Sequence, residues 1–190
     1  MIALRTDSAS PSAGRTMSSV IVNFVGFQVG WFACVLGAAH GMPWAGTAVA
    51  AAIVVLHLEL AGRPLEELKL VAIAMTVGAL WDSALVTLGW ITFTSGTAID
   101  GVAPQWILAM WALFATTLNI SLGWLKRRWI AGALLGAIAG PLAYWAGARL
   151  GAIVLVSPAL ALIALSIGWA VMTPLLAALA RRYNGIDKAN

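Results

Sequence analysis

The feature that most constrains this sequence is the placement of its positive charges around long apolar runs. Six runs can be read, each about long enough to span a bilayer. Ten of the eleven Lys and Arg residues fall outside these runs. They lie before the first run, after the second, after the fourth and after the sixth, whereas the connections 40–43 and 91–104 carry none. Because Lys and Arg accumulate on the cytoplasmic side of a membrane, this pattern predicts a six-helix integral membrane protein with both termini in the cytoplasm.

The predicted fold class is all-α, a polytopic membrane protein folded as a compact bundle of six transmembrane helices. Residues 1–19 are expected to form a disordered cytoplasmic tail, 20–180 the transmembrane domain and 181–190 a second cytoplasmic tail. A short amphipathic cytoplasmic turn is expected at Leu65–Lys69. The expected spans are Val20–Ala39, Trp44–Leu60, Leu70–Trp90, Gln105–Leu125, Trp129–Leu150 and Pro158–Ala180. A cleaved signal peptide ending near Ala39 is an alternative for the first span, which the five further runs disfavour.

The composition excludes several classes of protein. A hydrophobic fraction of 62% with 9% charged residues excludes an ordinary soluble globular domain. The net charge of +4 is spread over helix ends, which favours contact with anionic lipids as partners over binding to nucleic acid. One Cys and two His are too few soft ligands for a haem pair, an iron–sulfur cluster or a closed zinc site, so neither a metal nor a cofactor is expected.

Asp82 is the polar residue that most needs a structural explanation. Counted along the third run, its carboxyl group lies near the middle of the bilayer, where it must be neutral, paired or hydrated. Arg149 breaks the charge rule in the fifth run and is the natural partner for an ion pair with Asp82. Tyr144 can donate its hydroxyl to the same carboxylate. Alternatively, the Arg149 side chain extends to external headgroups and stacks on Trp145.

A second set of polar residues occupies the cytoplasmic third of the predicted bundle. Its members are Asn23 and Gln28 on the first run, His57 and Glu59 on the second, and Asn119 and Ser121 on the fourth. Because residues two apart point to nearly opposite sides of a helix, His57 is expected to face inward and Glu59 to reach water. A packing role with a hydrogen bond is favoured for His57 over a role as a ligand or proton relay.

The fifth run contains glycines at a spacing typical of close helix contacts. These are Gly132, Gly136 and Gly140, and the same spacing recurs at Gly147 and Gly151. Small residues four apart share one helix face and let another backbone approach closely. Packing within one subunit is favoured over a homodimer interface.

Four motifs are distinctive when taken together: Asn23-x4-Gln28-x2-Trp31, Asp82-Ser83, Ala115-Thr116-Thr117-Leu118-Asn119 and Gly140-Pro141-Leu142-Ala143-Tyr144-Trp145-Ala146-Gly147-Ala148-Arg149-Leu150-Gly151. With them the chain resembles an uncharacterised family of small bacterial inner-membrane proteins with a domain of unknown function. The similarity runs from about Asn23 to Leu179. It implies a compact six-helix protein of the bacterial cytoplasmic membrane with no established activity. Genes of this kind sometimes neighbour fatty-acid-modifying enzymes, which directs the functional hypothesis toward lipids by association only.

These observations predict one intramembrane polar pocket. Its expected lining residues are Asp82, Arg149, Tyr144, Asn119 and Gln28, with Asn23 and His57 nearby. The favoured function is binding or carriage of a small amphipathic or lipidic molecule. A lipid- or fatty-acid-modifying enzyme that uses Asp82 and His57 as acid and base is one alternative. A homo-oligomer or an assembly partner of another membrane protein, docked through the glycine face, is the other.

Overall fold

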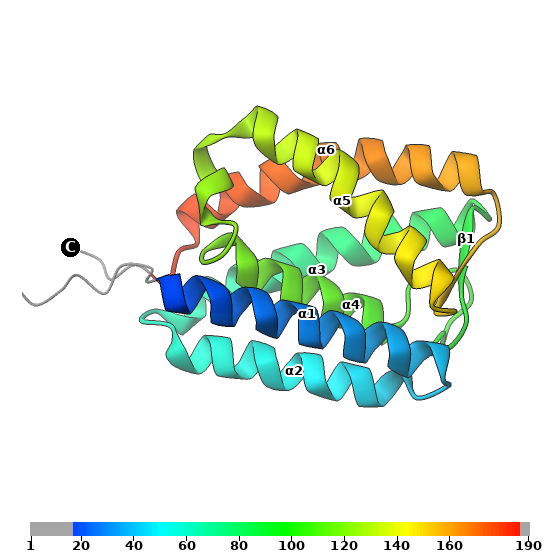
Figure 1. The fold of residues 1–190 in the computed structure, drawn as a ribbon, viewed down its shortest axis with the longest axis horizontal. Coiled ribbons are helices and arrows are strands. Elements are labelled where there is room, and N and C mark those ends of the chain that lie inside the picture. The colour runs from blue at the N-terminus through cyan, green and yellow to red at the C-terminus, as the bar shows by residue number, and fades with distance from the viewer. Residues whose placement is uncertain (1–16, 187–190) are drawn as a thin grey trace, which may run out of the picture.

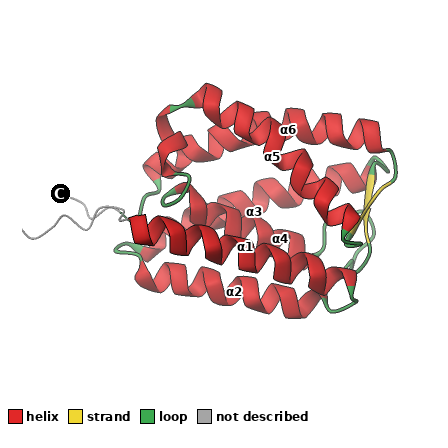
Figure 2. Ribbon diagram, viewed as in Figure 1, coloured by secondary structure: helices red, strands yellow, loops and turns green. Residues whose placement is uncertain are grey.

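The computed structural model describes residues 17–186, and within them the chain forms six α-helices, a 3-10 helix and two short strands (Figures 1 and 2). The α-helices are α1 (Met17–Ala39), α2 (Pro43–Leu60), α3 (Pro64–Thr87), α4 (Gln105–Leu118), α5 (Trp129–Arg149) and α6 (Pro158–Arg182). The 3-10 helix is η1 (Gly123–Arg127), and the strands are β1 (Ile91–Phe93) and β2 (Ile153–Leu155). The predicted all-α bundle is therefore confirmed.

Helix α4 forms the centre of the bundle. It contacts α1, α2, α3 and α6, while α5 packs mainly on α6 and α1 mainly on α2 (Figure 1). Most α4 side chains are buried, including Trp106, Ile107 and Leu113. The other five α-helices of the described chain are each long and apolar enough to cross a membrane.

The predicted fourth span is longer than the helix that forms. Helix α4 ends at Leu118, although the sequence predicts a span to Leu125. Its 14 residues extend about 21 Å, which is short of a hydrocarbon core of about 30 Å. The chain leaves the helix at Asn119 because the side chain of Asn119 is bonded to other segments, and the apolar residues that follow turn into η1.

The predicted turn at Leu65–Lys69 is wrong, because these residues form the first turns of α3. Pro64 occupies the start of this helix, where its missing N–H leaves no bond unmade. Glu66 and Glu67 follow in the first turn, where the helix dipole favours negative charge. Helix α3 is thus continuous from Pro64 and carries Glu67 into the bundle.

Two connections expected as loops pair at one end of the molecule. Strands β1 and β2 are antiparallel, with Ile91 opposite Leu155 and Phe93 opposite Ile153. We call this the ribbon end (right in Figure 1). The opposite end, where α1 begins and α6 finishes, is called the basic end, since it carries Arg63, Lys69, Lys126, Arg127, Arg128, Arg181 and Arg182.

The glycine stripe of α5 lies against α6 of the same chain. A Cβ added at Gly136 would lie 2.1 Å from the carbonyl oxygen of Trp169, and one at Gly140 would lie 2.3 Å from the Trp169 ring. Gly132 is looser, with Pro174 at 3.3 Å. All three glycines therefore face α6 of the same chain. Gly147 instead faces Ile153, and Gly151 turns the chain with a φ of +91°.

The predicted tails fall partly inside the described structure. Residues 17–19 belong to α1, and α6 continues through Arg181 and Arg182. After α6, Tyr183 and Gly185 make polar contacts with the bundle. Residues 1–16 and 187–190 of the two predicted tails lie outside the described residues.

Candidate functional site

A groove of about 480 Å³ opens between α1, α4, α5 and α6. Its lining is dominated by apolar and aromatic side chains. The lining residues are Phe24, Phe27, Gln28, Trp31, Val35, Met110, Trp111, Phe114, Thr117, Ser121, Leu122, Leu135, Gly136, Ala139, Gly140, Leu142, Ala143, Tyr144, Ile153, Trp169 and Thr173.

Stacked aromatic rings form one wall of this groove. The Trp111 and Trp169 rings are stacked with centroids 4.7 Å apart and planes 15° from parallel. Phe114 meets Trp169 edge-on at 5.2 Å. Gly140 allows this arrangement, because any side chain there would collide with the Trp169 ring. The wall is flat, rigid and apolar, which suits an aliphatic chain or another ring.

The groove is open on the outer surface of the bundle. Phe24 on α1 and Leu142 on α5 both line it, and they are 54% and 55% exposed. In a helical membrane protein such an outer surface faces the acyl chains of the bilayer.

Asp82 is fully buried behind this aromatic wall. Its Oδ2 accepts a 2.7 Å hydrogen bond from the indole N–H of Trp111, and its Oδ1 accepts one from the Tyr144 hydroxyl. Trp111 and Tyr144 both line the groove, whereas Asp82 does not. The carboxylate therefore orients two groove residues from behind and is not itself a lining group.

The predicted ion pair between Asp82 and Arg149 does not form within residues 17–186. Arg149 is exposed at the end of α5, at the ribbon end, and does not line the groove. Each carboxylate oxygen of Asp82 instead accepts one hydrogen bond, from Trp111 and from Tyr144, and the sequence predicted Tyr144 as a donor. Two neutral donors bind a buried carboxylate without the desolvation of a second charge.

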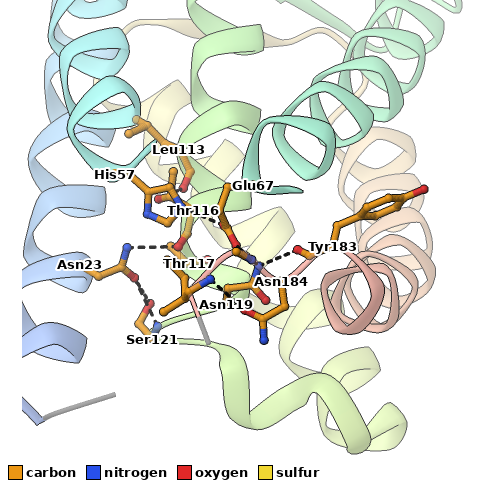
Figure 3. Close-up of polar contacts among 12 residues, drawn as sticks. Asn23, His57, Glu67, Leu113, Thr116, Thr117, Asn119, Ser121, Tyr183 and Asn184 are labelled. Carbon is orange, nitrogen blue, oxygen red and sulfur yellow. Dashed lines mark hydrogen bonds and ion pairs between the residues drawn. The ribbon is translucent and has the colours of Figure 1, made fainter. Parts of the chain in front are cut away.

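A second polar cluster lies at the basic end around Glu67 (Figure 3). Glu67 is fully buried, and its Oε2 lies 2.9 Å from Nε2 of His57 on α2. Its Oε1 accepts a 2.6 Å hydrogen bond from the Asn119 amide, and a 2.7 Å bond from the backbone N–H of Gly185. One carboxylate thus joins α2, α3, the end of α4 and the segment after α6. We call these contacts the Glu67 cluster.

The segment after α6 is held closely in this cluster. Asn119 also donates to the carbonyl of Tyr183 at 2.9 Å. The backbone N–H of Arg63 donates to Gly185 at 3.0 Å, and its side chain donates to the carbonyl of Asn184. A side chain at position 185 would lie 2.3 Å from the carbonyl oxygen of Arg63, so only glycine fits there.

Asn23 links α1 to the end of α4 nearby (Figure 3). Its amide nitrogen donates to the carbonyl of Thr116 at 3.2 Å, and its oxygen accepts from the Ser121 hydroxyl at 2.7 Å. The same oxygen also accepts from the backbone N–H of Ser121 at 3.3 Å, so Asn23 satisfies two backbone groups, this N–H and the Thr116 carbonyl, where α4 ends. Asn23 therefore joins α1 to the end of α4.

The predicted pocket residues are thus divided among four places. Gln28 and Tyr144 line the groove, and Asp82 supports its wall. His57 and Asn119 belong to the Glu67 cluster, Asn23 bonds to Ser121, and Arg149 lies apart at the ribbon end. As expected, His57 is buried and Glu59 is exposed.

Sequence reasoning missed Glu67 because it was assigned to a turn. The buried residues of α3 are Glu67, Leu70, Val71, Ala74, Gly78, Asp82 and Leu85, a continuous helical face. Extending the apolar periodicity of the third run back by one turn from Leu70 places Glu67 on that face. Pro64 followed by two acidic residues is also a helix-start signal.

No group of three or more His, Cys, Asp or Glu side chains is placed to hold a metal ion in the described part of the chain. No curated protein and no solved structure matches the sequence. The model of one protein family, described as "Protein of unknown function (DUF2878)", matches residues 20–175. That range covers most of the 190 residues and agrees with the extent of the resemblance inferred from the motifs. The chain belongs to the DUF2878 family of proteins of unknown function.

Proposed function

We propose that this chain is a multi-pass membrane protein that binds a single-chain amphipathic lipid, such as a fatty acid, in the groove between α1 and α5. The observation that carries the proposal is an apolar groove with a rigid aromatic wall and an exposed rim. Its volume of about 480 Å³ falls in the range of about 300–1,000 Å³ typical of ligand pockets.

The shape of the groove suits an extended aliphatic chain. On α1 its lining runs from Phe24 to Val35, a rise of about 16 Å along the bundle. Phe114 and Trp169 cover the middle of that length. An acyl chain bound there would replace its van der Waals contacts with lipid by contacts with a preformed wall. Because these contacts require a close fit, the wall would favour ligands of one shape.

Polar groups for a headgroup lie toward the basic end of the groove. Gln28 lines the groove, and its amide has no hydrogen-bond partner within residues 17–186. Thr117 and Ser121 line the same end, near the finish of α4. The arrangement favours a ligand with its polar group near Gln28 and its chain toward Tyr144 and Ile153.

The proposed orientation follows from the charge pattern. The basic end would face the cytoplasm of a bacterial cell, because Lys and Arg are retained on that side of the inner membrane. A ligand bound as described would then carry its polar group toward the cytoplasmic leaflet.

The two alternative functions receive less support from the geometry. Asp82 and Glu67 are 15 residues apart on α3, or about 22 Å along the helix, and His57 contacts Glu67. Asp82 and His57 are therefore too far apart to act as an acid–base pair on one substrate. The Gly132, Gly136 and Gly140 face lies on α6, so it is not a free docking surface.

The proposal is tested by photolabelling in lipid nanodiscs with a fatty acid that carries a diazirine at mid-chain. Labelled peptides should come from α4 and α6, and excess unlabelled fatty acid should remove the label. Ala139→Phe fills the groove and should reduce the competed label at least tenfold. Ile138→Phe is the matched control, since Ile138 is 60% exposed on the same helix but does not line the groove. Equal labelling of the two variants would refute the proposal.

A further inference from the structure

A second hollow lies at the basic end, between η1 and the end of α6. It has a volume of about 900 Å³ and shares no lining residue with the groove. Five of its lining residues are cationic: Lys126, Arg127, Arg128, Arg181 and Arg182. The others are Gly123, Trp124, Ala178 and Asn184.

Folding concentrates positive charge in this hollow. Residues 123–128 and 178–184 are about 50 positions apart in the chain, and the contact of η1 with α6 brings them together. No carboxylate lines the hollow, and none forms an ion pair with its four arginines among residues 17–186. Because like charges repel, a concave site with this composition is stabilised by an anion.

Aromatic rings hold two of the arginines in place. The Arg128 guanidinium lies 5.7 Å from the centre of the Trp124 ring, and that of Arg182 lies 5.8 Å from the Tyr183 ring. Such contacts restrict the long arginine side chains before a ligand binds, so that less conformational entropy is lost on binding. Planar guanidinium groups also match the oxygens of a phosphate with paired hydrogen bonds.

The position of the hollow indicates which anion is available to it. Trp124 lines the hollow, Trp129 follows the lining residue Arg128 in the chain, and their side chains are 47% and 51% exposed. Exposed Trp side chains at the end of a membrane helix lie at the level of the lipid headgroups. The phosphates of the bilayer are therefore the nearest anions at this depth.

We propose that this hollow binds the phosphate-bearing headgroup of an anionic phospholipid. Basic pockets between membrane helices on the cytoplasmic side are suited to such headgroups. The bound lipid would contact both η1 and the end of α6 and so stabilise their packing at the basic end, independently of any ligand in the groove.

Native mass spectrometry of the protein in a non-ionic detergent tests the proposal, with phosphatidylglycerol as the probe and zwitterionic phosphatidylcholine as its comparison. Phosphatidylglycerol should bind at one saturable site and phosphatidylcholine should not. The double variant Arg127→Gln/Arg181→Gln should weaken binding at least tenfold, on the basis of about fivefold for each charge removed. Lys69→Gln/Arg149→Gln is the control, because it removes two exposed charges outside the hollow.

Three outcomes would overturn the inference. The first is equal loss of phosphatidylglycerol binding in the two double variants, which would indicate general electrostatic attraction. The second is complete displacement by millimolar inorganic phosphate, which would assign the hollow to a soluble anion. The third is loss of the bound lipid in Ala139→Phe, which would place that lipid in the groove. Retained binding in Ala139→Phe leaves this site intact even if the photolabelling of the groove fails.

Discussion

Two carboxylates on the same face of α3 have different surroundings. Glu67 and Asp82 are both fully buried, about 22 Å apart along the helix. Glu67 contacts His57, the Asn119 amide and a backbone N–H, from three other segments of the chain. Asp82 accepts hydrogen bonds only from the indole of Trp111 and the hydroxyl of Tyr144 within the described chain.

The difference indicates that the two groups serve the protein in different ways. Glu67 joins segments that are otherwise separate, so its loss would loosen the basic end. Asp82 holds two side chains of the groove wall in fixed orientations, so its loss would change the groove. A buried carboxylate in a membrane helix is therefore not in itself a sign of a ligand site.

The largest effect is expected from Glu67→Leu. This substitution leaves His57, the Asn119 amide and the Gly185 N–H without their acceptor, which should lower the free energy of unfolding by about 3–5 kcal/mol. Glu67→Gln keeps one acceptor oxygen and should lose less than half as much. The free energy is measured by unfolding in mixed detergent micelles, followed by circular dichroism.

Glu66→Gln provides the control for this prediction. Glu66 is the neighbouring carboxylate and pairs at the surface with Lys69 at 2.8 Å. Its loss should change the free energy of unfolding by at most about 1 kcal/mol. A Glu67→Leu protein as stable as Glu66→Gln would mean that the Glu67 cluster contributes nothing to stability.

An intermediate effect is expected from Asp82→Ala, with a signature in the groove. The variant leaves two donors unpaired, the Trp111 N–H and the Tyr144 hydroxyl, against three partners for Glu67→Leu, and should lower the free energy of unfolding by about 1 kcal/mol for each. Asp82→Asn should be milder, because the amide oxygen accepts from Trp111 and the amide nitrogen donates to Tyr144. Photolabelling of the folded fraction should fall in Asp82→Ala and be retained in Asp82→Asn and Glu67→Gln. If Glu67→Gln reduced the labelling as strongly as Asp82→Ala, the distinction between the two carboxylates would fail.

The smallest effect is expected from Arg149→Gln. Since Arg149 is exposed and forms no ion pair with Asp82, the free energy of unfolding should change by no more than about 0.5 kcal/mol. Thermal unfolding of the two proteins side by side would measure this. A loss above about 2 kcal/mol would support the ion pair between Arg149 and Asp82 that the sequence suggests. Asp82 would then have a charged partner, and its contrast with Glu67 would no longer hold.

Hydropathy predicted the helices well but not the end of α4. The apolar residues 120–125 read as helix in a sequence window, yet the chain leaves the helix at Asn119. Hydropathy measures how apolar a segment is and not its hydrogen bonding. The contacts of Asn119 with Glu67 and Tyr183 decide where the helix ends, and they join positions more than 50 residues apart.

The candidate site was predicted only in part. The sequence indicated that Asp82 is buried and that Tyr144 can donate to it, because both follow from the residue type and its position within an apolar run. It did not indicate Trp111 as a partner. Gly78 explains why this contact exists, since a Cβ there would lie 2.1 Å from the Trp111 ring. The glycine lets the indole settle on α3 beside Asp82.

By itself, the sequence determined six apolar helices, the concentration of positive charge at one end and the burial of a carboxylate on the third helix. Each of these depends on residue type and spacing along the chain, since apolar length and charge act locally. The tertiary structure decided which donors meet Asp82 and Glu67, and that aromatic rings line an open groove. It also brought two distant basic segments together at one hollow. These depend on how close two backbones approach, which is set by the packing of glycines such as Gly78 and Gly136 against large side chains and backbone of other helices.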